Sequence, residues 1–268
     1  SYLALFIALQ GWLGARLIAK FKIPFVLQAL IVFPVLWLLF EWLRGWLFTG
    51  MPWLHLGYAF PVLPLSGYAP VFGVYGISLL VIFMTALVFF ALCSAGKARY
   101  IVAVVSIAII LMVGFGLSNI EWTVEKNKSI KVSLVQGNAE QITKWDADKI
   151  KLRMDTYARL SRQHWDSDVV IWPENAMTIF YHQLADDYLL PLAKEAKQTN
   201  TDLIIGLPFM DKDFENYYSS MMSFSAEDKN LESYSGVFNK VHLVPFGEYL
   251  PLKFLLDPLL DFLEIPMS

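Results

Sequence analysis

Four long apolar runs limit what this chain can fold into more than any other feature of its sequence. They cover residues 2–17, 23–40, 71–93 and 100–118, and the last three runs contain no charged residue. A helix needs about 20 mainly apolar residues to cross a bilayer, so we predict four membrane spans. One such run would also suit a buried core helix or a signal peptide, but four runs within 118 residues favour a membrane protein.

The charged residues divide the chain into two parts. Residues 1–118 contain six lysines and arginines and one acid, Glu41, which leaves 15 basic and 23 acidic residues for positions 119–268. The two parts therefore carry formal charges of +5 and −8. About 150 residues are enough for one globular core, so we predict a membrane part over residues 1–118 and an outer domain over residues 119–268. The net charge of −3 argues against a basic surface for nucleic acid.

Two short basic loops predict the orientation of the spans. Lys20 and Lys22 lie between the first and second runs, and Lys97 and Arg99 lie between the third and fourth. Basic loops favour the cytoplasmic side of a membrane, and the two loops are two crossings apart, so they agree. The chain then leaves the fourth span on the opposite side. We therefore expect residues 119–268 to lie outside the cytoplasm.

Tryptophans and prolines are concentrated between the second and third runs, in residues 41–70. Trp42, Trp46 and Trp53 are typical of the membrane–water interface, and the four prolines of the segment interrupt any long helix. We predict a loop on the non-cytoplasmic side of the membrane. It serves either as an interfacial anchor or as a lipid-facing platform below the outer domain.

The pattern after residue 119 predicts an α/β domain. Three expected strands alternate with two expected helices, in the order 130–136, 146–163, 168–172, 188–198 and 203–207. A hairpin and a short helix follow, at residues 217–225, 231–237 and 253–263. Strands that alternate with helices favour a layered α/β fold.

Two polar side chains follow expected strands, where the sites of α/β proteins form. Glu174 comes directly after the strand at residues 168–172, in the sequence Trp172-Pro173-Glu174, and is a candidate general base. Lys240 comes after the hairpin and is a candidate for stabilising a developing oxyanion. Each residue also has an ordinary interpretation, as an acid on a surface loop or as a lysine whose stem covers apolar neighbours.

A loop rich in proline and glycine presents Glu248, which is either a third candidate site residue or a solvated turn acid. His242 lies just before this loop. The other histidines, His55, His164 and His182, show no ligand spacing to it. We therefore expect His242 to support the site rather than to bind a metal, and we expect no cofactor. Two acids and a lysine make half of a covalent acyl-transfer site in which the nucleophile is missing.

Several of these patterns resemble known families. Pro173-Glu174 after a strand and Lys240-Val241-His242-Leu243 at a later strand end are similar to the nitrilase superfamily, whose members use a Glu–Lys–Cys triad on an αββα sandwich. Five segments resemble the apolipoprotein N-acyltransferase family of Gram-negative bacteria: EWLRGW (41–46), TGMPW (49–53), VQGN (135–138), KWD (144–146) and HLVPFGE (242–248). This resemblance covers essentially the whole chain. It implies a transmembrane α-helical region followed by an α/β nitrilase-like αββα sandwich domain.

The resemblance also implies a reaction in lipoprotein maturation. An acyl chain passes from a phospholipid to a cysteine thioester on the enzyme, and then to the N-terminal amine of a diacylglyceryl-cysteine apolipoprotein. Glu174 matches the general base, Lys240 the residue that stabilises the oxyanion, Glu248 a supporting carboxylate and Trp145 a tryptophan near the acyl path. The implied location is the bacterial inner membrane, with the catalytic domain in the periplasm. The resemblance implies no cofactor.

Cys93 is the only cysteine of the chain, and it lies in the third apolar run. We interpret it as a small packing or lipid-facing residue rather than as the nucleophile. The nucleophile of the family belongs to a Cys-Tyr-Glu segment, which we expect after Ser268, and the family has further spans before residue 1. We therefore expect an internal fragment whose sandwich is incomplete at its C-terminus and which has no turnover of its own.

Other functions remain as alternatives. The main one is a membrane-anchored lipid- or lipoprotein-binding module without catalysis. A transporter would need polar or charged residues inside its spans, and the four runs offer little beyond Gln10, Arg16 and Gln28. A soluble amidase that acts on small amides or nitriles is disfavoured by the membrane part.

Overall fold

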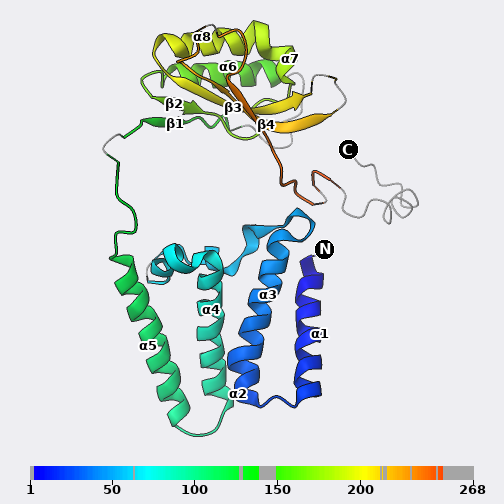
Figure 1. Cartoon of the computed structure of the whole chain (residues 1–268), viewed down its shortest axis with the longest axis vertical. Helices are drawn as coiled ribbons and strands as arrows, with labels where there is room; N and C mark the ends of the chain where they lie inside the picture. Colours follow the sequence, from blue (N-terminus) through cyan, green and yellow to red (C-terminus); the bar gives the residue numbers. More distant parts are fainter. Residues whose placement is uncertain are drawn as a thin grey trace, which may run out of the picture. The chain divides into compact units, whose positions relative to one another are not determined.

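The computed structural model of the chain describes residues 3–62, 64–126, 129–138, 149–211, 213, 216–229, 231–245 and 247–249. These residues form two compact units. The first unit, Ser1–Glu125 with His242–Ser268, contains the apolar helices, and the second unit, Lys126–Val241, contains a sheet. Each unit is described by itself below, with the element labels of Figure 1.

Four helical segments of the first unit are long and apolar enough to cross a membrane, as the sequence predicted: Leu3–Phe21, Phe25–Thr49, Leu65–Cys93 and Ala98–Ser118. Their long helices run alongside one another (Figure 1), and they are α1 (Leu3–Phe21), α3 (Phe33–Trp46), α4 (Ala69–Cys93) and α5 (Ala98–Ser118). The short α2 (Phe25–Leu27) leads through a π-helical turn (Gln28–Val32) into α3. Helix α3 contacts both α1 and α4, and α4 contacts α5.

The segment between the second and third spans is shorter than the predicted loop over residues 41–70. Helix α3 continues through Trp46, because the first proline of the segment is Pro52 and nothing earlier breaks the helix. At the other end, α4 begins at Ala69, and Pro70 occupies its first turn, where a missing N–H costs nothing. Short 3₁₀ turns, such as Pro52–Leu54 and Leu56–Ala59, fill the space between the two helices.

This extension places the acid of the membrane part, Glu41, inside a helix, with its side chain nearly buried (3% exposed). One carboxylate oxygen, Oε1, accepts the N–H of Leu56 at 2.5 Å and lies 3.6 Å from Nη2 of Arg44. Arg44 in turn donates to the carbonyl of Leu54 at 2.7 Å. The buried charges therefore satisfy backbone groups of the 3₁₀ turns, which would otherwise lack partners.

The second unit contains a mixed five-stranded sheet with strand order β1-β2-β3-β4-β5. The strands are β1 (Val132–Leu134), β2 (Val169–Ile171), β3 (Asp202–Met210), β4 (Tyr217–Phe224) and β5 (Gly236–Asn239). The first three are parallel, as strand–helix–strand crossovers require, and the last two pairings are antiparallel. The predicted α/β pattern is confirmed. The hairpin is present, although its second strand begins at Gly236, later than predicted, and residues 253–263 lie outside the described part.

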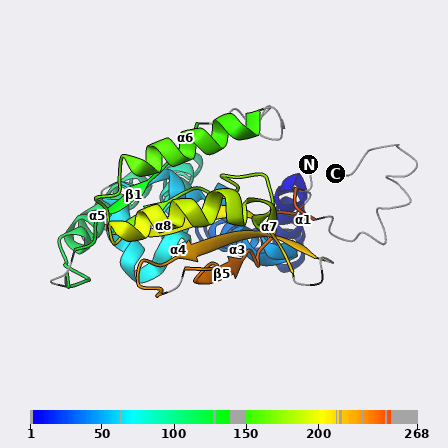
Figure 2. The same cartoon turned by 90° about the horizontal axis from the view of Figure 1, so that it is seen from above.

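Helices cover one face of this sheet. Helices α6 (Ile150–Arg162) and α8 (Leu190–Gln198) run side by side over it, and the short α7 (Tyr181–Leu184) precedes α8 (Figures 1 and 2). The core lies between these layers and includes the fully buried Val170, Leu203, Ile205 and Met222. On the opposite face, Leu134 and Phe238 are 78% and 64% exposed. Among the described residues, the unit thus contains one helical layer and one sheet.

Candidate active site

The position of Glu174 follows from the end of strand β2. Trp172 is completely buried, and its backbone N–H donates to the carbonyl of Ile204 in β3 at 2.8 Å, which continues the parallel ladder. Pro173 has no N–H to donate, so the ladder ends there. The chain then turns, and Glu174 projects from the carboxyl end of the sheet, where the sequence placed a candidate general base.

The turn at Glu174 lies unusually close to strand β3. A Cβ atom on Gly206 would lie 2.2 Å from the carbonyl oxygen of Pro173 and 2.8 Å from the Cα atom of Glu174. No side chain fits in that space, so glycine is required for close backbone approach. Gly206 interrupts an otherwise apolar strand, and an isolated glycine in a strand is a signal of such an approach. Gly206 is thus a residue of the site region that the motifs alone did not identify.

Lys240 reaches the same place from strand β5. Its backbone N–H donates to the carbonyl of Ser219 in β4 at 2.8 Å. Its Nζ atom lies 3.0 Å from Oε1 of Glu174, and the hydroxyl of Ser219 donates to the same oxygen at 3.2 Å. The structure thus brings together Glu174 and Lys240, which are 66 residues apart in sequence. Their side chains are 54% and 25% exposed, so substrate has access to both.

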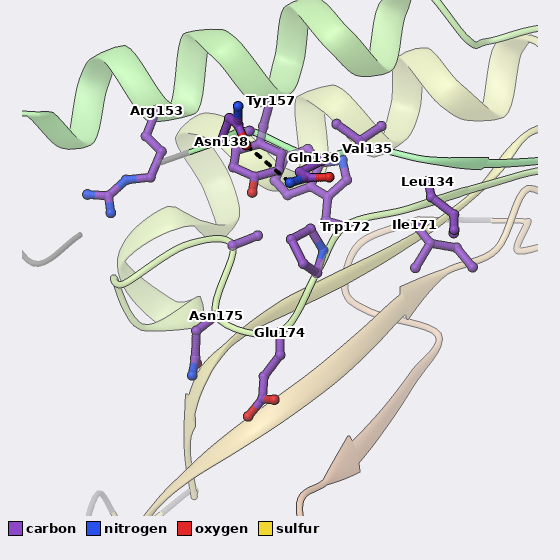
Figure 3. Close-up of a pocket in the computed structure, with 13 residues that line it drawn as sticks. Leu134, Val135, Gln136, Asn138, Arg153, Tyr157, Ile171, Trp172, Glu174 and Asn175 are labelled. Carbon is purple, nitrogen blue, oxygen red and sulfur yellow. Dashed lines mark hydrogen bonds between the residues drawn. The ribbon is translucent and has the colours of Figure 1, made fainter. Parts of the chain in front are cut away.

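A cavity of about 500 Å³ opens beside Glu174. This is within the range of about 300–1,000 Å³ that is usual for small-ligand sites. Figure 3 shows its walls, which come from the ends of β1 and β2, from the turn after Trp172 and from helix α6. Gln136 and Asn138, which belong to one of the segments that carried the family resemblance, form one wall and hydrogen bond to each other at 3.1 Å.

Helix α6 contributes two polar side chains to this cavity, Arg153 and Tyr157, and both are buried. Burial raises the pKa of the Tyr157 phenol, while a hydrogen bond with the backbone of Gly137 and the charge of Arg153 oppose this shift. The phenol therefore stays protonated at neutral pH. Gly137 is needed for this packing, because a Cβ atom there would lie 2.6 Å from the ring of Tyr157.

The remaining predicted site residues belong to the other compact unit or lie outside the described part. Glu248 and His242 are exposed and belong to the unit that contains the apolar helices. Oε2 of Glu248 accepts the N–H of Val244 at 2.7 Å. Trp145 lies outside the described residues. Cys93 is the last residue of α4 and is exposed, in the unit that lacks Glu174 and Lys240.

Metal binding was not expected from the sequence. Within the described ranges, the structure contains no group of three or more His, Cys, Asp or Glu side chains that is able to hold a metal ion. The groups that the described part of the site brings together are a carboxylate, an ammonium group and a serine hydroxyl, which share one oxygen atom, Oε1 of Glu174.

Comparison with known proteins assigns the sheet unit to a family. Residues 131–264 match the family model of carbon-nitrogen hydrolases. The chain belongs to the carbon-nitrogen hydrolase family. Residues 1–87 match the model of the apolipoprotein N-acyltransferase N-terminal domain, which supports the resemblance of the membrane part as well.

Whole-chain relatives agree with both matches. Apolipoprotein N-acyltransferases of Methylococcus capsulatus, Coxiella burnetii and Nitrosomonas europaea are 38%, 39% and 40% identical to this chain. The alignments cover 99–100% of the chain and 51–53% of each relative. The carbon-nitrogen hydrolase chain therefore spans about half the length of these curated relatives. The resemblance that the sequence motifs suggested is confirmed.

Sequence reasoning missed several residues of this carbon-nitrogen hydrolase site. Ser219 lies in the middle of strand β4, and no local pattern distinguishes it from its serine neighbour, Ser220. Arg153 and Tyr157 belong to the helix that the sequence predicts over residues 146–163, but their position beside Glu174 depends on how α6 packs on the sheet. Such contacts across the fold have no signature in a single sequence.

Proposed function

We propose that the full-length protein is a membrane-bound acyltransferase that moves an acyl chain from a phospholipid to the N-terminal amine of a diacylglyceryl-cysteine apolipoprotein. The observation that carries the proposal is the contact between Lys240 and Glu174, with Nζ and Oε1 3.0 Å apart at the carboxyl edge of a carbon-nitrogen hydrolase sheet. The names of the relatives and the four apolar helices support a membrane enzyme of this class.

In the first half-reaction, the Glu174 carboxylate takes the proton of the nucleophilic cysteine thiol that we propose for the full-length protein. The thiolate then attacks the ester carbonyl of the phospholipid, and the ammonium group of Lys240 stabilises the oxyanion that forms. The tetrahedral intermediate collapses to a thioester. The lysophospholipid leaves as an alcohol and takes its proton from Glu174.

In the second half-reaction, Glu174 accepts one proton from the neutral amine of the acceptor as its nitrogen attacks. The amine nitrogen attacks the thioester carbonyl, Lys240 again stabilises the oxyanion, and the C–S bond breaks. The products are an N-acylated lipoprotein and the regenerated thiol, which recovers the proton. Ser219 holds the shared carboxylate oxygen in place during both steps.

The location follows from the same proposal. Basic loops at Lys20, Lys22, Lys97 and Arg99 favour one side of the membrane as cytoplasmic. With the sheet unit on the opposite, periplasmic side of the inner membrane, both substrates are lipids anchored in the leaflet nearest the site. Glu248, Trp145 and His242 are proposed as supporting or substrate-binding residues.

The test uses the full-length protein, purified in detergent and incubated with a phospholipid that carries a labelled acyl chain. We expect label on the protein that is released by neutral hydroxylamine, which cleaves thioesters. Glu174→Gln and Lys240→Ala should each abolish it, because general-base and oxyanion contributions are each worth at least about 10²-fold. Glu232→Gln and Lys194→Ala, at exposed positions away from the site, are the matched controls.

Two results would contradict the proposal. If both variants label as fast as the controls, Glu174 and Lys240 do not have these roles. If the wild-type protein binds the phospholipid and the lipopeptide but never acquires label, the alternative of a lipid- or lipoprotein-binding module without catalysis is correct. Membrane insertion, checked for every variant, should be unchanged.

A further inference from the structure

The end of helix α3 has an unusual backbone. Three consecutive residues, Phe48, Thr49 and Gly50, have positive φ angles of 54°, 66° and 85°. Glycine adopts such angles without strain, but an aromatic residue and a β-branched residue rarely do. A Cβ atom at Gly50 would also lie 2.0 Å from the carbonyl oxygen of Gly45, so the turn folds tightly back onto α3.

This turn contacts a segment nearly 200 residues away in sequence. The hydroxyl of Thr49 lies within hydrogen-bond reach of the backbone carbonyl of Leu243 and also of the carbonyl of Phe48, at 2.5 Å. The hydroxyl of Tyr249 donates to the carbonyl of Phe48 at 2.7 Å. The two hydroxyl oxygens lie 3.5 Å apart. All of these residues belong to the unit that contains the apolar helices, although Leu243 and Tyr249 follow the sheet unit in the chain.

The segment that is held in this way carries Glu248. Between the two anchored residues, the N–H groups of Gly247 and Glu248 donate to the carbonyl of Val244 at 3.1 and 2.9 Å. The Glu248 carboxylate in turn accepts the N–H of Val244 at 2.7 Å. The loop is therefore closed by its own hydrogen bonds and fixed at both ends to the turn after α3.

We propose that the turn at Phe48–Gly50 is a docking site for the Glu248 loop, and that Thr49 and Tyr249 are positioning residues for acyl transfer. Helix α3 of the membrane part, and not the sheet, then determines the position of the Glu248 carboxylate. The positioning role rests on the proposed function, whereas the docking itself does not.

Two conservative changes test the docking without altering the loop. Thr49→Val and Tyr249→Phe each remove one hydroxyl and keep the size of the side chain. Hydrogen exchange of residues 241–250, measured in the full-length protein, should be about 10-fold faster in either variant, because the loop opens more often. Thr49→Ser retains the hydroxyl and should behave like the wild type. Thr85→Val, whose hydroxyl bonds only within α4 to Val81, is the matched control.

The activity of the same variants tests the positioning role. Thioester labelling and transfer should slow by about 10-fold or more, since a displacement of about 1 Å costs up to about 10²-fold. The loss should appear in kcat with the KM for phospholipid constant, because the positioning role concerns Glu248 as a carboxylate that supports the chemical step. The double variant should be little worse than either single one, since both hydroxyls hold one loop.

Each possible outcome decides one of two claims, the docking of the loop or its positioning role. Unchanged hydrogen exchange in Thr49→Val and Tyr249→Phe would overturn the docking. Faster exchange with full activity would overturn the positioning role, and so would failure of Thr49→Ser to restore activity. If the wild-type protein transfers no acyl chain, the proposed function and the positioning role both fail, and the exchange measurement still decides the docking.

Discussion

Replacing Gly206 with alanine should disable the site without changing any charged residue. The new Cβ atom would lie 2.2 Å from the carbonyl oxygen of Pro173, whereas ordinary contact begins at 3.4 Å, so one backbone segment must move by about 1.2 Å. Strand β3 is not the segment that moves, because it pairs with strands on both sides and its Leu203 and Ile205 are fully buried. The backbone of the turn that carries Glu174 must therefore move instead.

The turn is held more weakly than the strand. Its local hydrogen bonds are long, from the N–H of Ala176 to Pro173 at 3.2 Å and from the N–H of Met177 to Gly206 at 3.4 Å. Overpacking of this kind costs about 1–3 kcal/mol of unfolding free energy. A displacement of about 1 Å at a catalytic group costs about 10²-fold in rate. We therefore expect Gly206→Ala to lose about 10²-fold in thioester labelling while the protein still folds.

The assay compares Gly206→Ala with Gly236→Ala in the full-length protein. Gly236 lies in strand β5 of the same sheet, and a Cβ atom there would meet only the side-chain oxygen of Ser223, at 3.0 Å, which can rotate away. Labelling rate and thermal midpoint are measured for both. If Gly206→Ala labels at the rate of Gly236→Ala and melts at the same temperature, the close approach of Pro173 is not what positions Glu174.

Two further predictions concern stability. Burial lowers the pKa of His55, and the charge of Glu41 partly offsets this shift. Below the ordinary pKa of about 6.5, the unfolded chain therefore binds more protons at this position than the folded protein, so stability should fall as the pH drops through that range. His55→Gln should flatten this dependence of the thermal midpoint on pH, and an unchanged slope would refute the assignment. Ser161→Ala removes the acceptor for the buried indole N–H of Trp172, now bonded at 2.8 Å, and should cost about 1–3 kcal/mol. A thermal midpoint equal to that of the wild type would show that another group satisfies the indole.

Much of the fold could be predicted from the sequence because its signals are local. Apolar runs of the required length identify the spans, and short β-branched runs identify the strands. The limits of the loop after α3 were harder to predict, since Glu41 and Arg44 look like residues of a polar loop. Their burial depends on hydrogen bonds to Leu54 and Leu56, which are visible only once the 3₁₀ turns have folded back.

The candidate site, too, could be predicted from the sequence only in part. The approach of Glu174 and Lys240 could be anticipated because each directly follows a strand, and β2 and β5 run in the same direction, so that their carboxyl ends lie at the same edge of the sheet. Ser219 could not, since its role depends on the register of β4 with β3 and β5, in which it lies opposite Pro208. Glu248 was expected on a loop of the same α/β domain as Glu174 and Lys240, whereas the boundary between the two compact units falls between Val241 and His242.

The residue type at position 49 is itself an argument for the docking of the Glu248 loop. A non-glycine residue at positive φ costs about 1–3 kcal/mol, most for a β-branched side chain, and asparagine or glycine would relieve that cost at Thr49. Neither replacement provides a hydroxyl group for the contact that Thr49 makes with the carbonyl of Leu243. The Phe48 carbonyl, in the same turn after α3, accepts from Tyr249. A strained threonine is thus best explained by the contact that its hydroxyl makes, and Thr49→Asn should raise helix-end stability while it loosens the loop.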